Sequence, residues 1–175
     1  MKSLKAQIFS YDLVFALMAV AFLLWYSINA ANAFADKVGQ VEAGNKMAEV
    51  AQSALAQLTE SPGDPSDWGT LEANSLGISE SRGVIDRGKV EKLTAIVADS
   101  DGYEKVRAML SMNRQGGAFL FNLRVEEVDG RGLYSLGPKD PEEASVASVS
   151  KVMVMDGRLV RISMRTWDIA DGVGG

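Results

Sequence analysis

The stretch Leu13–Ala35, LVFALMAVAFLLWYSINAANAFA, is the only part of this chain that is long and apolar enough to cross a lipid bilayer. It contains no charged residue, and its polar interruptions are limited to Tyr26, Ser27, Asn29 and Asn32. A hydrocarbon core of about 30 Å requires roughly 20 mostly apolar helical residues, and the stretch meets that requirement. We therefore predict a membrane-spanning helix near the N-terminus.

The charges around this stretch predict its orientation. Lys2 and Lys5 precede it, and the first acidic residue is Asp12. Basic residues favour the cytoplasmic side of a spanning helix, which predicts a cytoplasmic N-terminus and an extracytoplasmic remainder. An ordinary secretory signal is an alternative, with Ala31-Asn32-Ala33 or Ala33-Phe34-Ala35 as the small-residue cleavage site, which would release a soluble secreted domain. An uncleaved stretch would instead leave a single-pass anchor.

The helical pattern continues past Ala35. Apolar residues recur at three- and four-residue spacings, with charged and amide residues elsewhere on the helical wheel. These apolar positions are Val38, Val41, Ala48, Val50, Ala51, Ala54, Leu55 and Leu58. We therefore predict one helix over residues 8–58, apolar in its first half and amphipathic in its second. Gly39 and Gly44 weaken it by up to about 1 kcal/mol each and are candidate positions for a bend or a close helix crossing.

The composition changes abruptly at residues 59–69, TESPGDPSDWG, where proline and glycine cannot continue a helix. We predict a connector over residues 59–70 and a head domain over residues 71–175. Trp68 is expected to fill the core beside the connector. Residues 71–84 are short, polar and punctuated by glycine, so irregular structure is predicted there.

Two helices are predicted in the head, over residues 87–98 with Asp86 as N-cap and over residues 103–112. Two carboxylates lie between them, in Asp99-Ser100-Asp101-Gly102, and raise the question of calcium. A calcium loop of the EF-hand type needs an oxygen ligand and a glycine at the next two positions, where tyrosine and glutamate stand instead. A capped turn is therefore predicted.

Beyond residue 117 the hydrophobic period changes to that of strands. Residues 119–126 alternate as in a strand with one wet face, and residues 145–155 and 158–167 form two strands joined by Asp156-Gly157. We predict a hairpin in which Met155 pairs with Arg158, so that one face collects most of the apolar residues. The fold class is therefore α+β: a long N-terminal helix, then a small head with two helices and an antiparallel sheet that includes a C-terminal hairpin.

Composition excludes several kinds of function. The 175 residues carry a net charge of −5 with both signs interspersed, which lacks the basic footprint that nucleic acid requires. Cysteine and histidine are absent, which removes thiolate and imidazole chemistry and haem ligation. The remaining catalytic candidates are carboxylates in loops: Asp64, Asp67, Asp140, Glu142 and Glu143. We expect neither enzymatic activity nor a cofactor or metal.

Residues 5–26, KAQIFSYDLVFALMAVAFLLWY, resemble the class III signal of archaeal type IV pilin-like proteins. The shared features are a short basic leader, a small residue before Gln7, an unbroken apolar helix and an acidic group a few residues into it. The resemblance implies that a prepilin peptidase removes a leader of about residues 1–7 by cutting around Ala6, Gln7 and Ile8, and that the apolar helix is retained.

The resemblance also implies a function. Mature subunits would leave the cell membrane and bundle their helices with copies of themselves into an extracellular filament, driven by an assembly ATPase and a membrane platform protein. Asp12 would meet the freed N-terminal amine of a neighbouring subunit if the cut follows Gln7, and would lie one residue late if it follows Ala6. Alternatively, Asp12 is a carboxylate at the membrane surface. The expected assembly residues are Asp12, Phe15, Leu17, Ala19, Phe22, Leu24 and Trp25.

Two functions therefore remain from the sequence. One is a structural pilin, with adhesion among the roles that its head surface would serve. The other is a binding domain that does not polymerise and is either anchored by a single span or released by signal cleavage.

Overall fold

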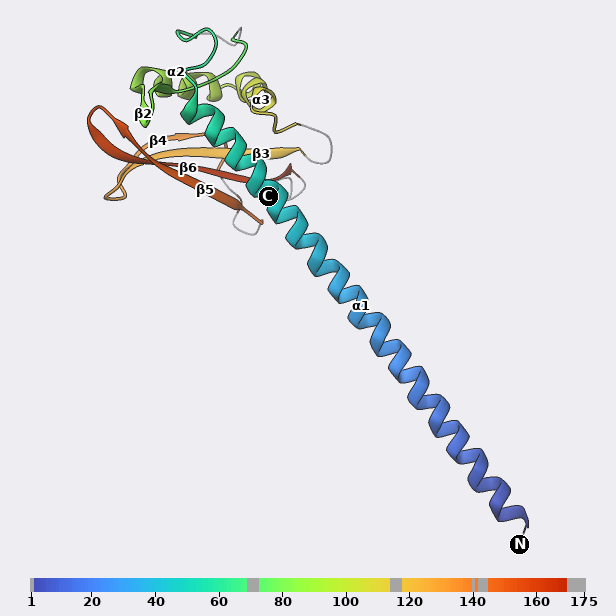
Figure 1. Ribbon diagram of the computed structural model, residues 1–175. Helices are drawn as coiled ribbons and strands as arrows, with labels where there is room; N and C mark the ends of the chain where they lie inside the picture. The colour runs from blue at the N-terminus through green and yellow to red at the C-terminus, as the bar shows by residue number, and fades with distance from the viewer. Residues whose placement is uncertain (1, 69–72, 114–117, 140, 142–144, 170–175) are drawn as a thin grey trace. The chain divides into compact units, whose positions relative to one another are not determined.

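The computed structural model describes residues 2–68, 73–113, 118–139, 141 and 145–169, with side chains described from residue 13 onward (Figure 1). The chain divides into two compact units, residues 1–43 and residues 44–175. Helix α1 (Lys2–Glu60) supplies all the secondary structure of the first unit and continues into the second. The fold is α+β, as the sequence predicts.

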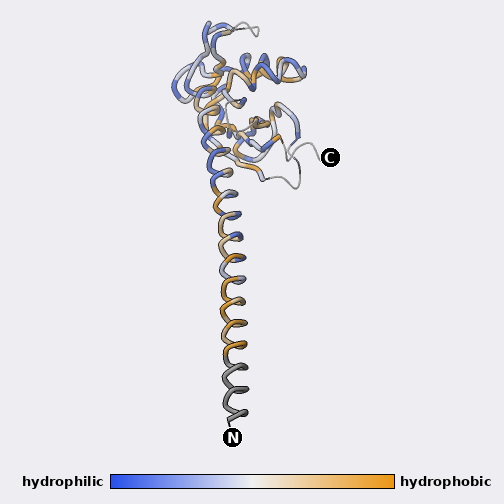
Figure 2. The backbone as a smooth tube through the Cα atoms, turned by 90° about the vertical axis from the view of Figure 1, so that its right-hand side faces the viewer, coloured by the Kyte–Doolittle hydropathy of each residue, from blue (hydrophilic) through white to orange (hydrophobic). Residues whose placement is uncertain are grey.

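The predicted long helix is confirmed, although it begins at Lys2 and ends at Glu60, a few residues beyond each predicted bound. Figure 2 shows its stretch from residue 13 as strongly hydrophobic, whereas hydrophilic and hydrophobic residues alternate in the turns that follow. The helix continues through Gly39 and Gly44, and no atom lies within 4 Å of the place where a Cβ would stand at either glycine.

The second unit contains a six-stranded sheet in the order β1-β2-β5-β6-β3-β4. Its strands are β1 (Ser79–Ser81), β2 (Val84–Ile85), β3 (Phe119–Glu127), β4 (Gly132–Leu136), β5 (Ala147–Met155) and β6 (Arg158–Asp168). Every pairing is antiparallel except that of β2 with β5. Helices α2 (Arg87–Val97) and α3 (Ser100–Met109) lie with the end of α1 on one side of the sheet (Figure 1).

The end of α1 forms part of the head core. Its buried apolar residues are Met47, Ala51, Ala54, Leu55 and Leu58, which belong to the predicted amphipathic half. Hydrogen bonds connect this part of α1 to β6 and to α3. The Thr166 hydroxyl donates to the carbonyl of Met47 at 3.3 Å, and the Gln57 amide donates to the carbonyl of Met109 at 3.4 Å. The compact head unit therefore begins within α1, at residue 44, whereas the sequence-based division began the head at residue 71.

The C-terminal hairpin has the predicted register. Met155 pairs with Arg158, and Val149 pairs with Met164. Asp156 and Gly157 both have positive φ, 52° and 75°, which is the geometry of a type I′ turn. The apolar face that the alternation predicts is buried, with Met153, Met155, Val160, Ile162 and Met164 facing the core.

Both predicted helix caps are present in the head. The Asp86 carboxylate accepts from the backbone N–H of Lys89 at 3.2 Å, and the Asp99 carboxylate accepts from that of Gly102 at 3.1 Å. These bonds satisfy N–H groups that a helix start leaves without a partner. The second bond confirms the capped turn at Asp99 and starts α3 at Ser100, three residues earlier than predicted.

Trp68 fills the core beside the connector, as predicted, with 2% of its surface exposed. Its indole N–H donates to the carbonyls of Gly77 at 2.8 Å and of Pro62 at 3.2 Å. The chain passes so closely here that a Cβ at Gly77 would collide with the carbonyl oxygen of Ser61. The connector is therefore packed against the head.

Three details of the prediction were wrong. Residues 71–84 were assigned irregular structure, yet β1 and the start of β2 lie there, and β4 was not predicted. These strands have two to five residues, too few to display an alternating pattern. The wet face expected for β3 is also closed at Asn122, which is buried and whose amide donates to the carbonyls of Gly137 and Pro138.

Candidate functional site: the exposed apolar half of helix α1

The first unit presents an apolar surface with no cover. From Leu13 to Phe34 the large apolar side chains are 45% to 71% exposed, the extremes being Val14 and Phe34. They are Leu13, Val14, Phe15, Leu17, Met18, Val20, Phe22, Leu23, Leu24, Trp25, Tyr26, Ile28 and Phe34. Contiguous apolar exposure on this scale marks a surface that contacts a partner or a membrane. Among the described residues, α1 is the one helix long and apolar enough to span a membrane.

One polar side chain of this surface, that of Asn29, is satisfied within the helix. The Asn29 amide donates to the carbonyl of Trp25 at 2.8 Å, one turn back along the helix. The helix satisfies its own backbone hydrogen bonds, which is what a bilayer requires of any segment that spans it. The rings of Phe22 and Trp25 lie 5.9 Å apart and tilted against each other. The stretch can therefore enter lipid without an unpaired charge.

The predicted assembly residues lie on more than one face of α1. Phe15, Ala19 and Phe22 follow each other at spacings of four and three residues and share a face. Leu17 and Leu24, seven residues apart, share another. These five residues and Trp25 are exposed. The surface is therefore apolar around the helix, which suits contact with several neighbours at once or with lipid.

The predicted processing residues Ala6, Gln7 and Ile8 have helical backbone within α1, as does Asp12. Their side chains lie outside the described residues, so their proposed roles in cleavage and assembly rest on the sequence.

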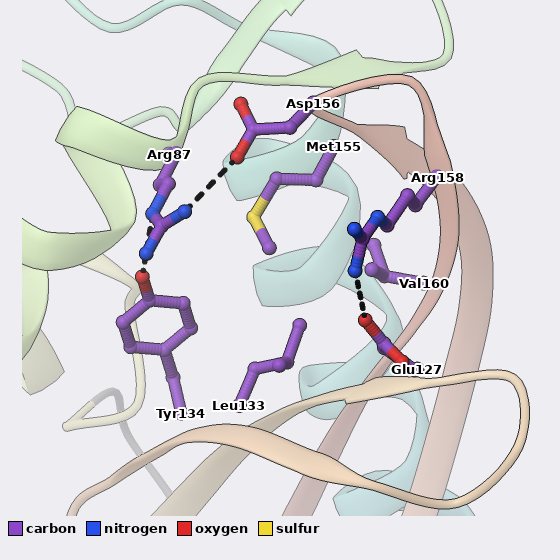
Figure 3. A pocket seen from close by; sticks show the side chains of 8 residues that line it. All are labelled: Arg87, Glu127, Leu133, Tyr134, Met155, Asp156, Arg158 and Val160. Carbon is purple, nitrogen blue, oxygen red and sulfur yellow. Dashed lines mark hydrogen bonds and ion pairs between the residues drawn. The ribbon is translucent and has the colours of Figure 1, made fainter.

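The head carries a separate open pocket of about 590 Å³ at the end of the hairpin (Figure 3). Its lining comes from α2, the end of β3, β4, and the adjoining ends of β5 and β6 with the turn between them: Arg87, Glu127, Leu133, Tyr134, Met155, Asp156, Arg158 and Val160. Figure 3 shows polar side chains on both flanks, with Met155 and Leu133 between them. The pocket is thus apolar inside and charged at its rim.

Arg87 is the centre of a network on one flank of this pocket. Its guanidinium lies 2.9 Å from Glu91, 3.3 Å from Asp156 and 3.1 Å from the Tyr134 hydroxyl, which in turn donates to Glu91 at 2.9 Å. On the other flank, Arg158 lies 3.1 Å from Glu127. The network ties α2 to β4 and to the hairpin turn. Because its ion pairs are largely exposed and screened by solvent, each contributes little to stability.

The network also fixes the charges of its members. Hydrogen bonds from Arg87 and then from Tyr134 lower the pKa of Glu91, so this carboxylate stays ionised. Burial, followed by the bond to Glu91, raises the pKa of Tyr134. Hydrogen bonds to Glu91, then to Tyr134 and Asp156, raise the pKa of Arg87. The charged groups at the rim therefore bond to one another, and these bonds connect α2, β4 and the hairpin turn.

Sequence reasoning missed this pocket because its residues are far apart along the chain and belong to no motif. The carboxylates that it did single out are placed differently. Asp64 accepts from the Asn74 amide at 2.9 Å, and Asp67 is exposed in a turn. Asp140, Glu142 and Glu143 lie outside the described residues. No group of three metal-binding side chains occurs in the part of the chain that was described.

No protein-family model, curated protein or solved structure matches this chain significantly. The arrangement of its helices and strands can still be compared with known architectures. A long N-terminal apolar helix followed by a small head with a β-sheet fits a pilin-like architecture.

Proposed function

We propose that this chain is a structural subunit of an archaeal type IV pilus-like extracellular filament. The observation that carries the proposal is the uncharged stretch Leu13–Ala35 of α1, whose side chains are exposed. Exposure of such an apolar helix surface to water is unfavourable, so lipid or other protein is expected to cover it.

The same surface suits two successive environments. Before assembly, the bilayer covers it, with the N-terminus in the cytoplasm and the head outside. After assembly, the corresponding helices of neighbouring copies cover it. The small residues of the stretch permit close approach between helices: Ala16, Ala19, Ala21, Ala30, Ala31 and Ala33.

The C-terminal end of α1 is part of the head core. Because Ala51, Leu55 and Leu58 are buried in the head core, the head is joined to α1 through packed side chains as well as through the chain. A filament of such subunits would carry its heads on helices that are part of their cores. In this proposal a prepilin peptidase removes the leader, and an assembly ATPase with a membrane platform protein extracts the subunit from the membrane.

The position of the mature N-terminus tests the proposal. We expect N-terminal sequencing and intact mass of the protein from its native cells to begin at Gln7 or Ile8. A start at Phe34 or Asp36 would identify an ordinary secretory signal and overturn the proposal. An intact Met1 would identify a static anchor, which also overturns it.

Asp12 provides a second test, because a buried carboxylate among apolar helices costs several kcal/mol unless a positive group pairs with it. We expect Asp12→Ala to leave membrane insertion intact and to abolish filaments seen by electron microscopy. Asp36→Ala, which removes the next acidic residue of the same helix, is the matched control and should still form filaments. Normal filaments from Asp12→Ala would remove Asp12 from its proposed role.

A further inference from the structure

The sheet of the head has two open edges of different composition. At one side, β4 is the last of the described strands and pairs with β3. At the other side, β2 has two residues and pairs with β5 at a single position, Val84 with Val154. Within the described residues, the part of β5 from Ala147 to Val152 therefore has no strand beside it on the side away from β6.

The open part of β5 presents backbone hydrogen-bonding groups. The N–H of Val154 donates to the carbonyl of Gly83 at 2.9 Å, so the backbone groups of Val154 point away from β6. Since backbone groups alternate along a strand, those of Ser148, Ser150 and Val152 point the same way. These three residues are exposed. Such a row is a template for an additional strand.

The two edges carry little of the charge that usually prevents sheets from joining, although β4 is short and its register with β3 shifts between Val125 and Glu126. Natural edge strands are blunted by charged side chains, bulges or shortness. The short β1 has all of these, with Glu80 at its centre and an irregular register. In contrast, β4 reads GLYSL and has no charge. The open part of β5 has only Lys151, whose ammonium is held 2.8 Å from Glu60.

The two edges also match in position. Ser135 on β4 pairs with Arg124, Arg124 pairs with Ser163, and Ser163 pairs with Ser150 on β5. The serines at the two ends of this row are exposed and lie on the same face of the sheet. In a second head placed beside the first, Ser135 of one copy would lie next to Ser150 of the other. Both side chains are small and uncharged, so they would neither clash nor repel each other.

We infer that the heads of neighbouring copies join by strand addition, with β4 of one head pairing along Ala147–Val152 of β5 of the next. The two edges differ, so the contact is heterologous, and a heterologous contact builds an open helical assembly when the rotation between copies does not close a ring. This inference rests on the proposed function, because the copies meet in the filament. It adds a head-to-head interface to the helix bundle.

Cysteine crosslinking tests this interface cleanly, since the natural chain has no cysteine. Full-length chains carrying S135C and S150C together are assembled in cells and treated with a short bifunctional maleimide. We expect a ladder of covalent oligomers from this double variant and none from either single variant. S135C with S81C, which moves one thiol from β5 to the exposed β1, is the matched control and should give no ladder.

The outcomes separate this inference from the proposed function. Filaments by electron microscopy together with a ladder support both. Filaments without a ladder leave the proposed function standing and overturn the strand pairing. Dimers from S150C alone would show that β5 pairs with itself, which also overturns the inference. If the unmodified chain forms no filaments in its native cells, the proposed function falls and this interface falls with it.

Discussion

The two halves of helix α1 share one secondary structure and have opposite surroundings. In the first half Leu24 is 59% exposed, and in the second half Leu58 is fully buried. The first half is apolar on every side, while the second has one apolar seam that packs into the head core. The comparison shows that helix formation by itself does not decide burial. The distribution of charge around the helix decides which neighbours it can accept.

The largest expected difference between the halves comes from truncating one leucine in each. Leu58→Ala should lower the free energy of unfolding of the head by about 2–5 kcal/mol, because it leaves a cavity in a closed core. Leu24→Ala should change it by less than about 0.5 kcal/mol, because this side chain is 59% exposed and is not a member of the head core. Denaturant unfolding of the full chain in detergent micelles, followed by near-UV circular dichroism, measures both. Equal losses would contradict the comparison.

Two glycines give the next contrast. Gly77→Ala should destabilise the head by about 1–3 kcal/mol, since its methyl group would collide with the carbonyl oxygen of Ser61. Gly39→Ala lies in open space within α1 and should favour the helix by up to about 1 kcal/mol. Thermal unfolding of the head and the helical circular dichroism signal measure the two effects. A loss of helix in Gly39→Ala would show that this position is not an ordinary helical site.

The smallest expected effect is electrostatic and depends on pH. A hydrogen bond from Lys151 lowers the pKa of Glu60 below its ordinary value of 4.5. A carboxyl whose pKa is lowered by folding stabilises the fold above its unfolded pKa, and this contribution disappears as the pH falls through the folded pKa. The melting temperature of Glu60→Gln should therefore be slightly below that of the natural chain near neutral pH and converge with it in acid.

Glu42→Gln is the control for this titration, because Glu42 lies in the exposed part of α1. Its melting curve for the head should match that of the natural chain at every pH. A difference between the natural chain and Glu60→Gln that grew on acidification would have the wrong sign and would contradict the assigned cause.

The elements that sequence reasoning predicted correctly have signals within a short window. The helix caps at Asp86 and Asp99 and the turn at Asp156-Gly157 each depend on residues within four positions of one another. The hairpin register follows from that turn and from the period of two along each strand. Such features are predictable because local chemistry is sufficient to produce them.

The elements that were missed are produced by distant parts of the chain. The short strand β1 is held at its start by the backbone of the connector, where Ser79 donates to the carbonyl of Ser61 at 3.2 Å. Arg87, Tyr134 and Asp156 meet at the head pocket from three separate elements. Neither arrangement leaves a periodic signal in the sequence, because each depends on which elements pack side by side.

The sequence by itself determined the apolar helix, its amphipathic continuation and the C-terminal hairpin, since hydrophobic period, helix caps and turn residues act over a few positions. Only the tertiary structure decided that the compact head unit begins within α1 at residue 44 and that, among the described residues, β4 and the start of β5 each lack a strand on one side. The physical reason is that strand order, burial and the pairing of backbone groups depend on contacts between residues far apart in the chain.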